Sequence, residues 1–379
     1  MKKEFKSITE AGDLAGKRVL LRASLNVPIR DGAVVDVFRV HKALKTIEYL
    51  RERGARTVIV AHLGRNPENT FRPLYEYLKK ISVVGFVEDI VGEKARGEIS
   101  KMQNGDVLLL ENIRRNPGEI NNDPLFSKSL AGLADIYVND GFAASHRKHA
   151  SIIGVPKFLP SYAGLLFEEE VLELSKAHSP THPALFILGG AKFKTKEPLV
   201  IKFLDMYDHV FVGGALANDF YKAMGYNVGR SLVSDTPPSI EHLVSDERVM
   251  LPSDVTVLTL SGSRIVKKPN EVLDDEAIND CGPETLRNLE QLALDSKFIL
   301  WNGPIGDYQR GFTENTEMLA RTIAASGAYT IVGGGDTMAL LSKLDLDETF
   351  SFSSTAGGAM LEYLLEGTLP GIEALKKSV

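Results

Sequence analysis

Basic side chains follow several short apolar runs in the first half of the chain. The runs are RVLLR (18–22), TVIVA (57–61), DVLLL (106–110) and DIYV (135–138). Arginine pairs with phosphate and carboxylate through two parallel hydrogen bonds, and clustered arginines repel one another unless an anion is present. The pattern therefore predicts a site for a small, multiply charged anion, formed by Arg22, His62, Arg65, Arg114 and Arg147.

Glycines take the corresponding positions in the second half, after ALFIL (184–188), HVFV (209–212), KFIL (297–300) and YTIV (329–332). Glycine permits close backbone approach, and a helix start offers free N–H groups, so the combination suits nucleotide phosphates. Asp336 is a candidate ligand of Mg²⁺, directly or through water. The residues that this pattern predicts for the nucleotide site are Gly189, Gly190, Lys192, Lys196, Gly213, Gly214, Gly303, Gly333, Gly334, Gly335 and Asp336, with a further helix start at Gly357 and Gly358.

A histidine pair, a cysteine and a tryptophan have two interpretations each. His146 and His149 have the spacing of a metal-binding pair, but without a third ligand the pattern favours phosphate binding or structural hydrogen bonds. Cys281 is a packed residue or a nucleophile, and packing is favoured. Trp301 belongs to the core or to the wall of an adenine pocket, and the core is favoured.

The elements that would position these residues alternate along the chain. The apolar runs, with DVTVL (254–258) among them, are typical of strands buried on both faces. Residues 40–50 carry an apolar stripe with helical spacing, and a second stripe follows Pro283. The predicted fold is α/β: two doubly wound, parallel-sheet (Rossmann-like) domains joined by an interdomain helix and hinge.

The segment 164–183 is the predicted boundary, because an acidic amphipathic helix there ends in a break rich in Pro, Ser and His. The predicted divisions are an N-terminal domain at 1–168, an interdomain helix at 164–179 and a C-terminal domain at 180–365. The alternative is one more crossover helix in a single large sheet.

Composition excludes several classes of protein. The 379 residues are 44 % hydrophobic and 25 % charged, as in an ordinary folded protein, and no apolar run reaches the length of a membrane span. The lone cysteine gives no reason to expect an oxidising compartment, so a cytoplasmic location without membrane association is expected. Residues 1–170 hold 26 Lys and Arg against 22 Asp and Glu, and residues 171–379 hold 18 against 28, net charges of +4 and −10. This split predicts two different small-molecule sites and no nucleic-acid partner.

Common nucleotide-binding motifs are missing. The segment around Gly12 and Gly16 falls one residue short of a P-loop and precedes a strand, and no G-x-G-x-x-G follows the first strand. Neither the catalytic loop nor the D-F-G of protein kinases is present. Few families of two-domain phosphotransferases remain.

The sequence resembles the phosphoglycerate kinases almost from end to end. The matching segments are the Arg-x-x-x-Asn-Val-Pro of 22–28, HLGR (62–65), the EN-I-R of 111–114, the YVND to HAS segment (137–151), GGAK (189–192), the LP-x-DV of 251–255, the GP-x-T of 282–285, the WNGP-x-G of 301–306 and GGGDT (333–337). The resemblance implies a phosphotransferase with a carboxyl group as acceptor, which transfers a phosphoryl group reversibly between 1,3-bisphosphoglycerate and Mg-ADP to give 3-phosphoglycerate and Mg-ATP, in glycolysis and gluconeogenesis.

The resemblance also implies residue roles. The substrate 3-phosphoglycerate would contact Arg22, Ser24, Asn26, His62, Arg65, Arg114 and Arg147, and Arg39 would contact the phosphoryl group during transfer. Lys192, Lys196 and Thr337 would bind nucleotide phosphates, Gly213 and Gly214 would lie near the adenine, Asp336 would bind the metal, and Gly357 and Gly358 would face the transfer path. Gly190, Asn302, Pro304, Gln309 and Gly333 to Gly335 complete the implied nucleotide site. The C-terminal segment, about 366–379, would pack on the N-terminal domain, and a monomer is expected.

Four departures from the family pattern concern these sites. Ser24 replaces an aspartate that contacts the substrate hydroxyl, and Gln309 replaces a glutamate that contacts the ribose. Phe193-Lys194-Thr195 adds a cation between the two lysines, and Ala356 and Met360 change the last glycine segment. None removes a residue that the chemistry needs, so altered affinity is expected. Two alternatives remain: a kinase for a related small carboxylic acid, and a non-catalytic protein that binds metabolites.

Overall fold

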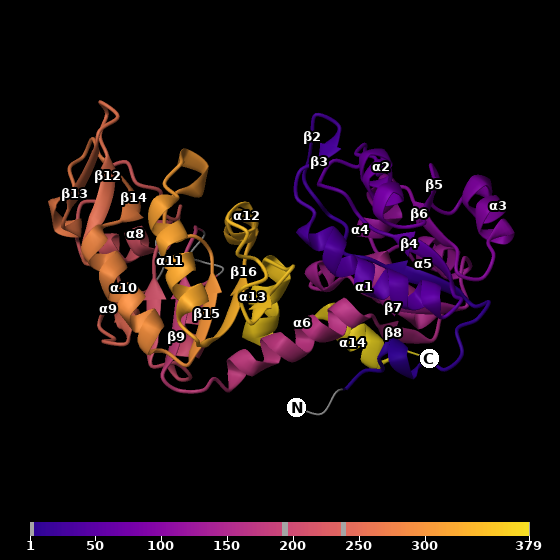
Figure 1. The fold of residues 1–379 in the computed structure, drawn as a ribbon. Helices are drawn as coiled ribbons and strands as arrows, with labels where there is room; N and C mark the ends of the chain where they lie inside the picture. Colours follow the sequence, from indigo (N-terminus) through magenta and orange to yellow (C-terminus); the bar gives the residue numbers. More distant parts are fainter. Residues whose placement is uncertain (1–3, 192–195, 236–239, 379) are drawn as a thin grey trace. The chain divides into compact units, whose positions relative to one another are not determined.

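The fold is that of a computed structural model, which describes residues 4–191, 196–235 and 240–378 (Figure 1). The chain divides into two compact units. The first comprises residues 1–172 and 366–379, and the second comprises residues 173–365. Lys192 and the segment Phe193-Lys194-Thr195 lie outside the described residues.

The first unit is built on a sheet of six parallel strands in the order β5-β6-β4-β1-β7-β8. Both faces of the central strands are buried, as four of the five residues of β1 are, which agrees with the continuous apolar runs of the sequence. The strands are β1 (Arg18–Arg22), β4 (Arg56–Val60), β5 (Gly85–Val87), β6 (Val107–Leu110), β7 (Ile136–Asn139) and β8 (Ser161–Ala163), and β2 (Ile29–Arg30) and β3 (Ala33–Val34) form a separate hairpin.

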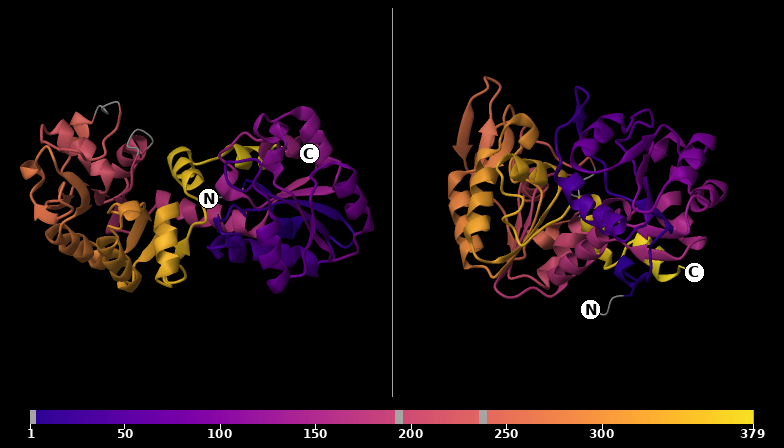
Figure 2. Two further views of the ribbon diagram at one scale, coloured as in Figure 1. Left: turned by 90° about the horizontal axis from the view of Figure 1, so that it is seen from above. Right: turned by 45° about the vertical axis from the view of Figure 1, so that its right-hand side comes forward.

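The helices of the first unit cover this sheet, as the left view of Figure 2 shows. The predicted stripe on the first helix is confirmed, because Val40, Ala43, Ile47 and Leu50 are buried in one core with the sheet residue Val19. The helices are α1 (Phe38–Glu52), α2 (Arg72–Ile81), α3 (Glu93–Lys101), α4 (Pro117–Ile120), α5 (Pro124–Ala131) and α14 (Pro370–Lys376), while α6 (Leu165–Ser175) begins in the first unit and ends in the second.

The described residues near the two termini belong to the same unit, and α14 packs on it (Figure 1). Lys376 of α14 forms an ion pair with Glu4. The backbone N–H of Gly371 donates to the carbonyl of Ser145 at 2.8 Å. The C-terminal helix is therefore attached to the segment that follows β7.

The second unit contains another sheet of six parallel strands, in the order β11-β10-β9-β15-β16-β17. Its strands are β9 (Ala184–Leu188), β10 (His209–Val212), β11 (Val249–Met250), β15 (Phe298–Asn302), β16 (Tyr329–Gly333) and β17 (Phe352–Ser353). Its helices are α7 (Glu197–Leu204), α8 (Ala215–Ala223), α9 (Glu241–Val244), α10 (Pro283–Asp295), α11 (Glu314–Ala325), α12 (Gly335–Lys343) and α13 (Gly358–Glu366). The predicted fold class, two α/β domains with parallel sheets, is confirmed.

One predicted strand has a different environment. The run at 254–258 forms β12 (Val255–Leu258), which pairs antiparallel with β13 (Arg264–Lys267) and β14 (Ala277–Cys281) in a separate small sheet. Its residues alternate between buried and partly buried. The prediction of burial on both faces is therefore wrong for this strand, because an antiparallel sheet can leave one face to solvent.

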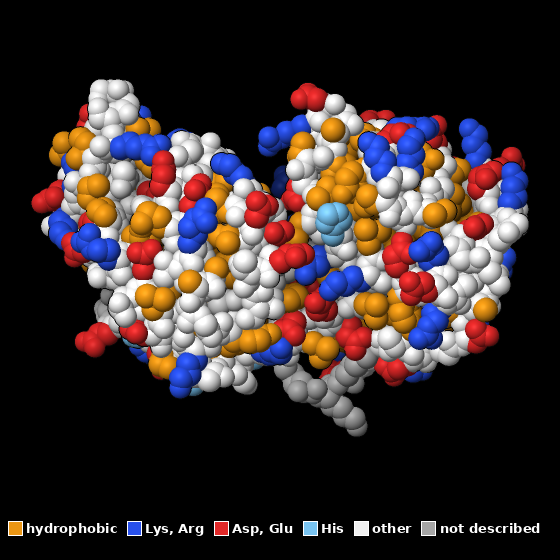
Figure 3. Space-filling view, in the orientation of Figure 1, with side chains coloured by type: hydrophobic (Ala, Val, Ile, Leu, Met, Phe, Trp, Pro, Cys, Tyr) orange, Lys and Arg blue, Asp and Glu red, His pale blue; other side chains and the backbone are white. Residues whose placement is uncertain are grey.

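Among the described residues, no helix is long and apolar enough to cross a membrane. Figure 3 shows that side chains of both charges are interspersed on the visible face of each unit.

Candidate functional site

Arg22 lies at the carboxyl end of β1 and is buried, with 1 % of its surface exposed. Its Nε donates to Ser151 Oγ at 2.9 Å and its Nη1 to the carbonyl of Ala23 at 2.6 Å. Its Nη2 lies 2.8 Å from Nδ1 of His62, which follows β4. The sequence predicts that Arg22 lies at the rim of the sheet. In the structure its guanidinium is buried, and each of its three nitrogens has a hydrogen-bond partner.

His62 is held in its neutral form. Burial is the main cause that places its pKa well below the usual value, and the charges of Arg22, Arg114 and Arg147 add to it. A neutral imidazole has one donor and one acceptor nitrogen. Since Nδ1 faces the guanidinium donor of Arg22, Nδ1 accepts and the proton belongs on Nε2, from which it can be donated to an anion.

Arg114 and Arg147 complete the positive cluster. Burial, followed by the charges of Arg147 and Arg22, lowers the pKa of Arg114 to about 10. Arg147 Nη1 lies 3.4 Å from His62 Nε2, and its pKa is lowered by burial and by the charge of Arg65. The Arg114 Nε is buried without a hydrogen-bond partner among the described residues. Such a donor is rare in folded proteins and suits an anionic ligand.

Asn26 connects the cluster to the first helix. Its side-chain oxygen accepts from the backbone N–H of Gly64 at 2.7 Å, and its carbonyl accepts from Nη1 of Arg39, at the start of α1, at 2.8 Å. Arg114 also donates to the carbonyl of Gly64. Ser24 is buried, with 6 % exposed, and no described contact joins it to the arginines. All the predicted substrate residues thus belong to the first unit.

Two residues of the cluster were missed by sequence reasoning. Glu119 is fully buried on α4, and Ser151 donates to it from its backbone N–H at 2.9 Å and from its hydroxyl at 2.6 Å. Glu119 is acidic, so a search for basic side chains after the apolar runs could not find it. The only local feature of the sequence that could have drawn attention to Glu119 was its place in the segment Pro117-Gly118-Glu119, just after the basic pair 114–115.

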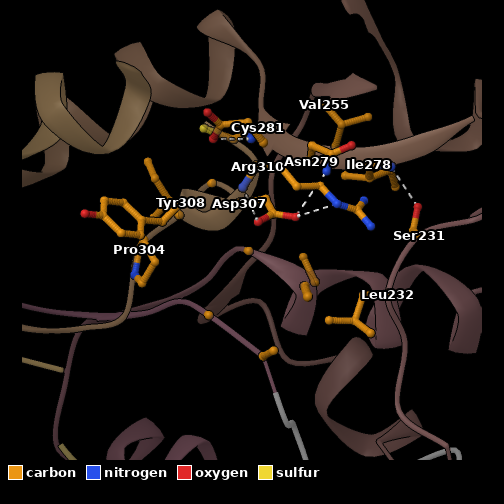
Figure 4. A pocket seen from close by; sticks show the side chains of 18 of the residues that line it. Ser231, Leu232, Val255, Ile278, Asn279, Cys281, Pro304, Asp307, Tyr308 and Arg310 are labelled. Atoms are coloured by element: carbon orange, nitrogen blue, oxygen red, sulfur yellow. Dashed lines mark hydrogen bonds and ion pairs between the residues drawn. The ribbon is translucent and has the colours of Figure 1, made fainter. Parts of the chain in front are cut away.

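A cavity of about 600 Å³ lies in the second unit. Figure 4 shows Asn279 and Arg310 directed toward Asp307 in its wall. The Asn279 Nδ2 donates to Asp307 Oδ2 at 3.3 Å, and Arg310 Nε lies 3.6 Å from the same oxygen. The predicted residues that line the cavity are Gly190, Gly214, Pro304, Gln309 and Asp336. Those that sequence reasoning missed include Tyr221, Asn279, Asp307 and Tyr308.

Close backbone packing at this cavity explains its glycines. Gly214 and Gly303 adopt positive φ angles of 60° and 91°. A Cβ on Gly303 would lie 2.5 Å from the carbonyl oxygen of Gly189, and one on Gly214 would lie 2.8 Å from the backbone nitrogen of Gly190. Larger residues would push these loops apart and change the cavity floor.

The start of α12 follows the end of β16 directly. Gly334 has a φ of 108°, and Gly335 is the first residue of the helix. Thr337, in the first turn, is fully buried, and its hydroxyl has no hydrogen-bond partner among the described residues. Gly357 lies beside this helix start, since a Cβ on it would be 3.9 Å from the backbone nitrogen of Gly335. Two helix starts and an unpaired hydroxyl thus meet, an arrangement that suits phosphate oxygens.

The remaining predicted nucleotide residues lie around the same loops. Lys196 donates to the carbonyl of Gly189 at 2.6 Å and is 8 % exposed. Asn302, at the end of β15, is buried beside Met360, with Nδ2 3.6 Å from the thioether sulfur. Gly213 follows β10, and Gln309 and Asp336 are exposed. Lys192 lies outside the described residues.

The residues with two interpretations differ in their surroundings. Trp301 is fully buried and donates to the carbonyl of Gly303 at 2.8 Å, so it belongs to the core. Cys281 is 2 % exposed, and burial raises the pKa of its thiol, which disfavours a nucleophile. His149 Nδ1 lies 3.6 Å from Glu119, and no group of three potential metal ligands occurs among the described residues.

Comparisons with known proteins identify the family of the chain. The family model "Phosphoglycerate kinase" matches residues 8–368. Phosphoglycerate kinases from Wolbachia sp. subsp. Drosophila simulans and Pelotomaculum thermopropionicum are 39 % and 40 % identical, over 96 % of this chain and 97 % of theirs. The solved phosphoglycerate kinase structures from Coxiella burnetii and Pyrococcus horikoshii cover 98 % of each chain, with TM-scores of 0.82 and 0.86 at 36 % and 30 % identity. The chain belongs to the phosphoglycerate kinase family, transferases of glycolysis that move a phosphoryl group to or from a carboxyl group.

Proposed function

We propose that the basic cluster of the first unit binds 3-phosphoglycerate and that the cavity and helix starts of the second unit bind Mg-ADP or Mg-ATP. The observation that carries the first assignment is the crowding of Arg22, Arg114 and Arg147 around a neutral His62. Three guanidinium groups in one partly buried place repel one another, and a bound dianion relieves that repulsion. Arg65 would add its charge from the exposed rim, and Asn26 would orient Arg39 toward the transferred phosphoryl group.

For the second unit, the support is the meeting of two helix starts beside the unpaired hydroxyl of Thr337. The backbone N–H groups at these starts would bind phosphate oxygens, with Lys196 and Lys192 supplying charge. Asp336 would hold Mg²⁺ as part of the Mg-nucleotide substrate. One carboxylate suffices for this role, because Mg²⁺ takes its other ligands from phosphates and water. Gly213 and Gly214 would lie against the adenine, and Gln309 would accept a hydrogen bond from the ribose.

The chemistry needs positioning and charge compensation more than proton transfer. The carboxylate of 3-phosphoglycerate is already ionised at pH 7, so no general base is required. Arg39 and the helix start at Gly357 and Gly358 would neutralise charge on the phosphoryl group while it moves in line between the two oxygens. Since the two ligands bind to different units, the units must approach each other for transfer. Such a hinge motion would exclude water and suppress hydrolysis of ATP.

The test of this assignment is a coupled assay of the purified protein with 3-phosphoglycerate and Mg-ATP. Turnover that requires both substrates and Mg²⁺, and that stops when EDTA removes the metal, is expected. Absence of turnover despite nucleotide binding would contradict the assignment. We also propose a cytoplasmic monomer; cell fractionation and light scattering of the full chain test those two points.

A further inference from the structure

The carboxylate of Glu119 lies behind the basic cluster, and the family resemblance gives it no role. Its side chain is fully buried and receives two hydrogen bonds from Ser151. One of these, at 2.6 Å, comes from the serine hydroxyl. A hydroxyl has a single proton, so this bond fixes the direction in which the lone pairs of Ser151 Oγ point.

The lone pairs of Ser151 Oγ face Arg22, whose Nε donates to them at 2.9 Å. The other end of the Arg22 guanidinium donates to Nδ1 of His62 at 2.8 Å. A continuous chain of hydrogen bonds therefore runs from Glu119 through Ser151 and Arg22 to His62. Glu119 orients Ser151 Oγ, and Ser151 Oγ holds the Nε of Arg22. Since a guanidinium can only donate, Nδ1 of His62 accepts from Arg22, and the proton of His62 lies on the nitrogen that faces Arg147.

The charge of Glu119 also acts on the whole cluster. Burial lowers the pKa values of Arg22, Arg114 and Arg147, and the charge of Glu119 opposes this lowering, which favours their charged forms. Burial opposes the charge of Glu119 itself, but the contact with His149, the charge of Arg22 and the bonds from Ser151 bring its pKa below the usual value. The carboxylate is therefore ionised in a place where a lone buried charge would be unfavourable.

The hydrogen-bond chain and the negative charge of Glu119 have opposite effects on the binding of an anionic substrate. A negative charge behind the site repels the substrate, so its removal by itself would strengthen binding. Loss of the hydrogen-bond chain would release Arg22 and leave His62 free to adopt the other tautomer, which would weaken binding. We propose that Glu119 is a positioning residue for phosphoryl transfer, which holds Arg22 and His62 through Ser151, and that this effect outweighs its repulsion of the substrate. The proposal rests on the assignment of 3-phosphoglycerate to the basic cluster.

The experiment compares Glu119→Gln and Ser151→Ala in the coupled assay. Each variant is expected to raise the phosphoglycerate KM about tenfold, which corresponds to about 1.4 kcal/mol. The Mg-ATP KM should stay within about twofold of the wild-type value. Both residues belong to one chain of hydrogen bonds. The phosphoglycerate KM of the double variant should therefore be no higher than that of the single variant with the higher KM.

Glu48→Gln is the matched control. Glu48 belongs to the same unit and accepts from Ser82 Oγ at 2.6 Å, but it is 31 % exposed and has no described contact with the basic cluster. Its substitution is expected to leave both KM values unchanged. Thermal unfolding of every variant separates a loss of stability from a loss of substrate binding.

An unchanged or lower phosphoglycerate KM in Glu119→Gln would overturn the proposal, because charge repulsion would then dominate. Additive effects in the double variant would also overturn it. If Glu119→Gln does not fold, Ser151→Ala decides alone, and an unchanged KM in that variant contradicts the proposal.

Arg114→Gln identifies failure of the underlying assignment, since it removes a guanidinium of the cluster without touching Glu119 or Ser151. If the phosphoglycerate KM is unchanged in Arg114→Gln, the substrate binds elsewhere.

Discussion

Nη2 of Arg22 lies 2.8 Å from Nδ1 of His62, so the imidazole accepts a hydrogen bond from a guanidinium that is itself buried. This contact brings the ends of β1 and β4, neighbouring strands of one parallel sheet, into a single site. Burial lowers the pKa of His62, and the positive charge of Arg22 at this contact adds to that effect, which leaves His62 as a neutral donor at neutral pH. The proposed substrate site would thus attract anions without relying on a protonated histidine.

The neutrality of His62 predicts a pH effect on stability. Folding lowers the pKa of His62, so on acidification the unfolded chain binds a proton at this residue before the folded chain does. The contribution of neutral His62 to the free energy of unfolding is therefore present above the unfolded pKa of about 6.5 and is lost as the pH falls below it. We expect His62→Gln to reduce the fall in unfolding free energy between pH 7 and 5, by at most about 1.4 kcal/mol per pH unit. Urea unfolding at several pH values measures it. Parallel pH curves for variant and wild type would contradict the shift.

Arg39→Ala is expected to reduce kcat at least about 10³-fold, the scale of an arginine that compensates charge in phosphoryl transfer. Nucleotide affinity, measured by calorimetry, should remain unchanged. Lys42→Ala, on the same helix, should retain wild-type turnover. A kcat within about threefold of wild type for Arg39→Ala would disprove the role assigned to this guanidinium.

Thr337→Val tests the nucleotide site. Its hydroxyl is buried without a partner among the described residues, so replacing it should leave the Tm of the ligand-free protein unchanged or raise it. The same substitution removes a donor to a charged phosphate, which is expected to raise the nucleotide Kd about tenfold or more. Thr330→Val is the opposite control, because that hydroxyl accepts from the backbone N–H of Ser351 at 2.9 Å. It should lower Tm and leave the nucleotide Kd unchanged.

Ser24→Asp restores the carboxylate that the resemblance implies. A charged acceptor for the substrate hydroxyl is stronger than a serine by about 1 kcal/mol, so the phosphoglycerate KM should fall about fivefold. Ser24→Ala serves as the comparison, with a modestly raised KM. Equal KM values in all three proteins would mean that position 24 does not contact the substrate.

The sequence predicted the two parallel sheets because their strands are buried on both faces and therefore read as continuous apolar runs. It failed at β12, whose run looks the same although only alternate side chains of Val255–Leu258 are buried. It also failed to indicate β14, which ends in Asn279, Asp280 and Cys281 and contributes them to the cavity wall. A strand with polar residues at its end gives no apolar signal.

The residues of the candidate site also divide into those that the sequence could predict and those that it could not. Residues that directly follow a buried strand, such as Arg22 and His62, were predictable because the carboxyl ends of parallel strands meet at one edge. Glu119 was not, since it reaches the cluster from a short helix between strands and contacts it through Ser151, 32 residues away. Such contacts depend on tertiary packing, which no local pattern encodes.

The central claim is that the arginine cluster of the first unit binds 3-phosphoglycerate independently of the nucleotide. Isothermal titration of this substrate into the wild type and into Arg114→Gln tests it most directly. Loss of one guanidinium from a charge-assisted pair should weaken binding about ten- to a hundredfold, with the Mg-ADP Kd unchanged. Equal phosphoglycerate Kd values for the two proteins would contradict the claim.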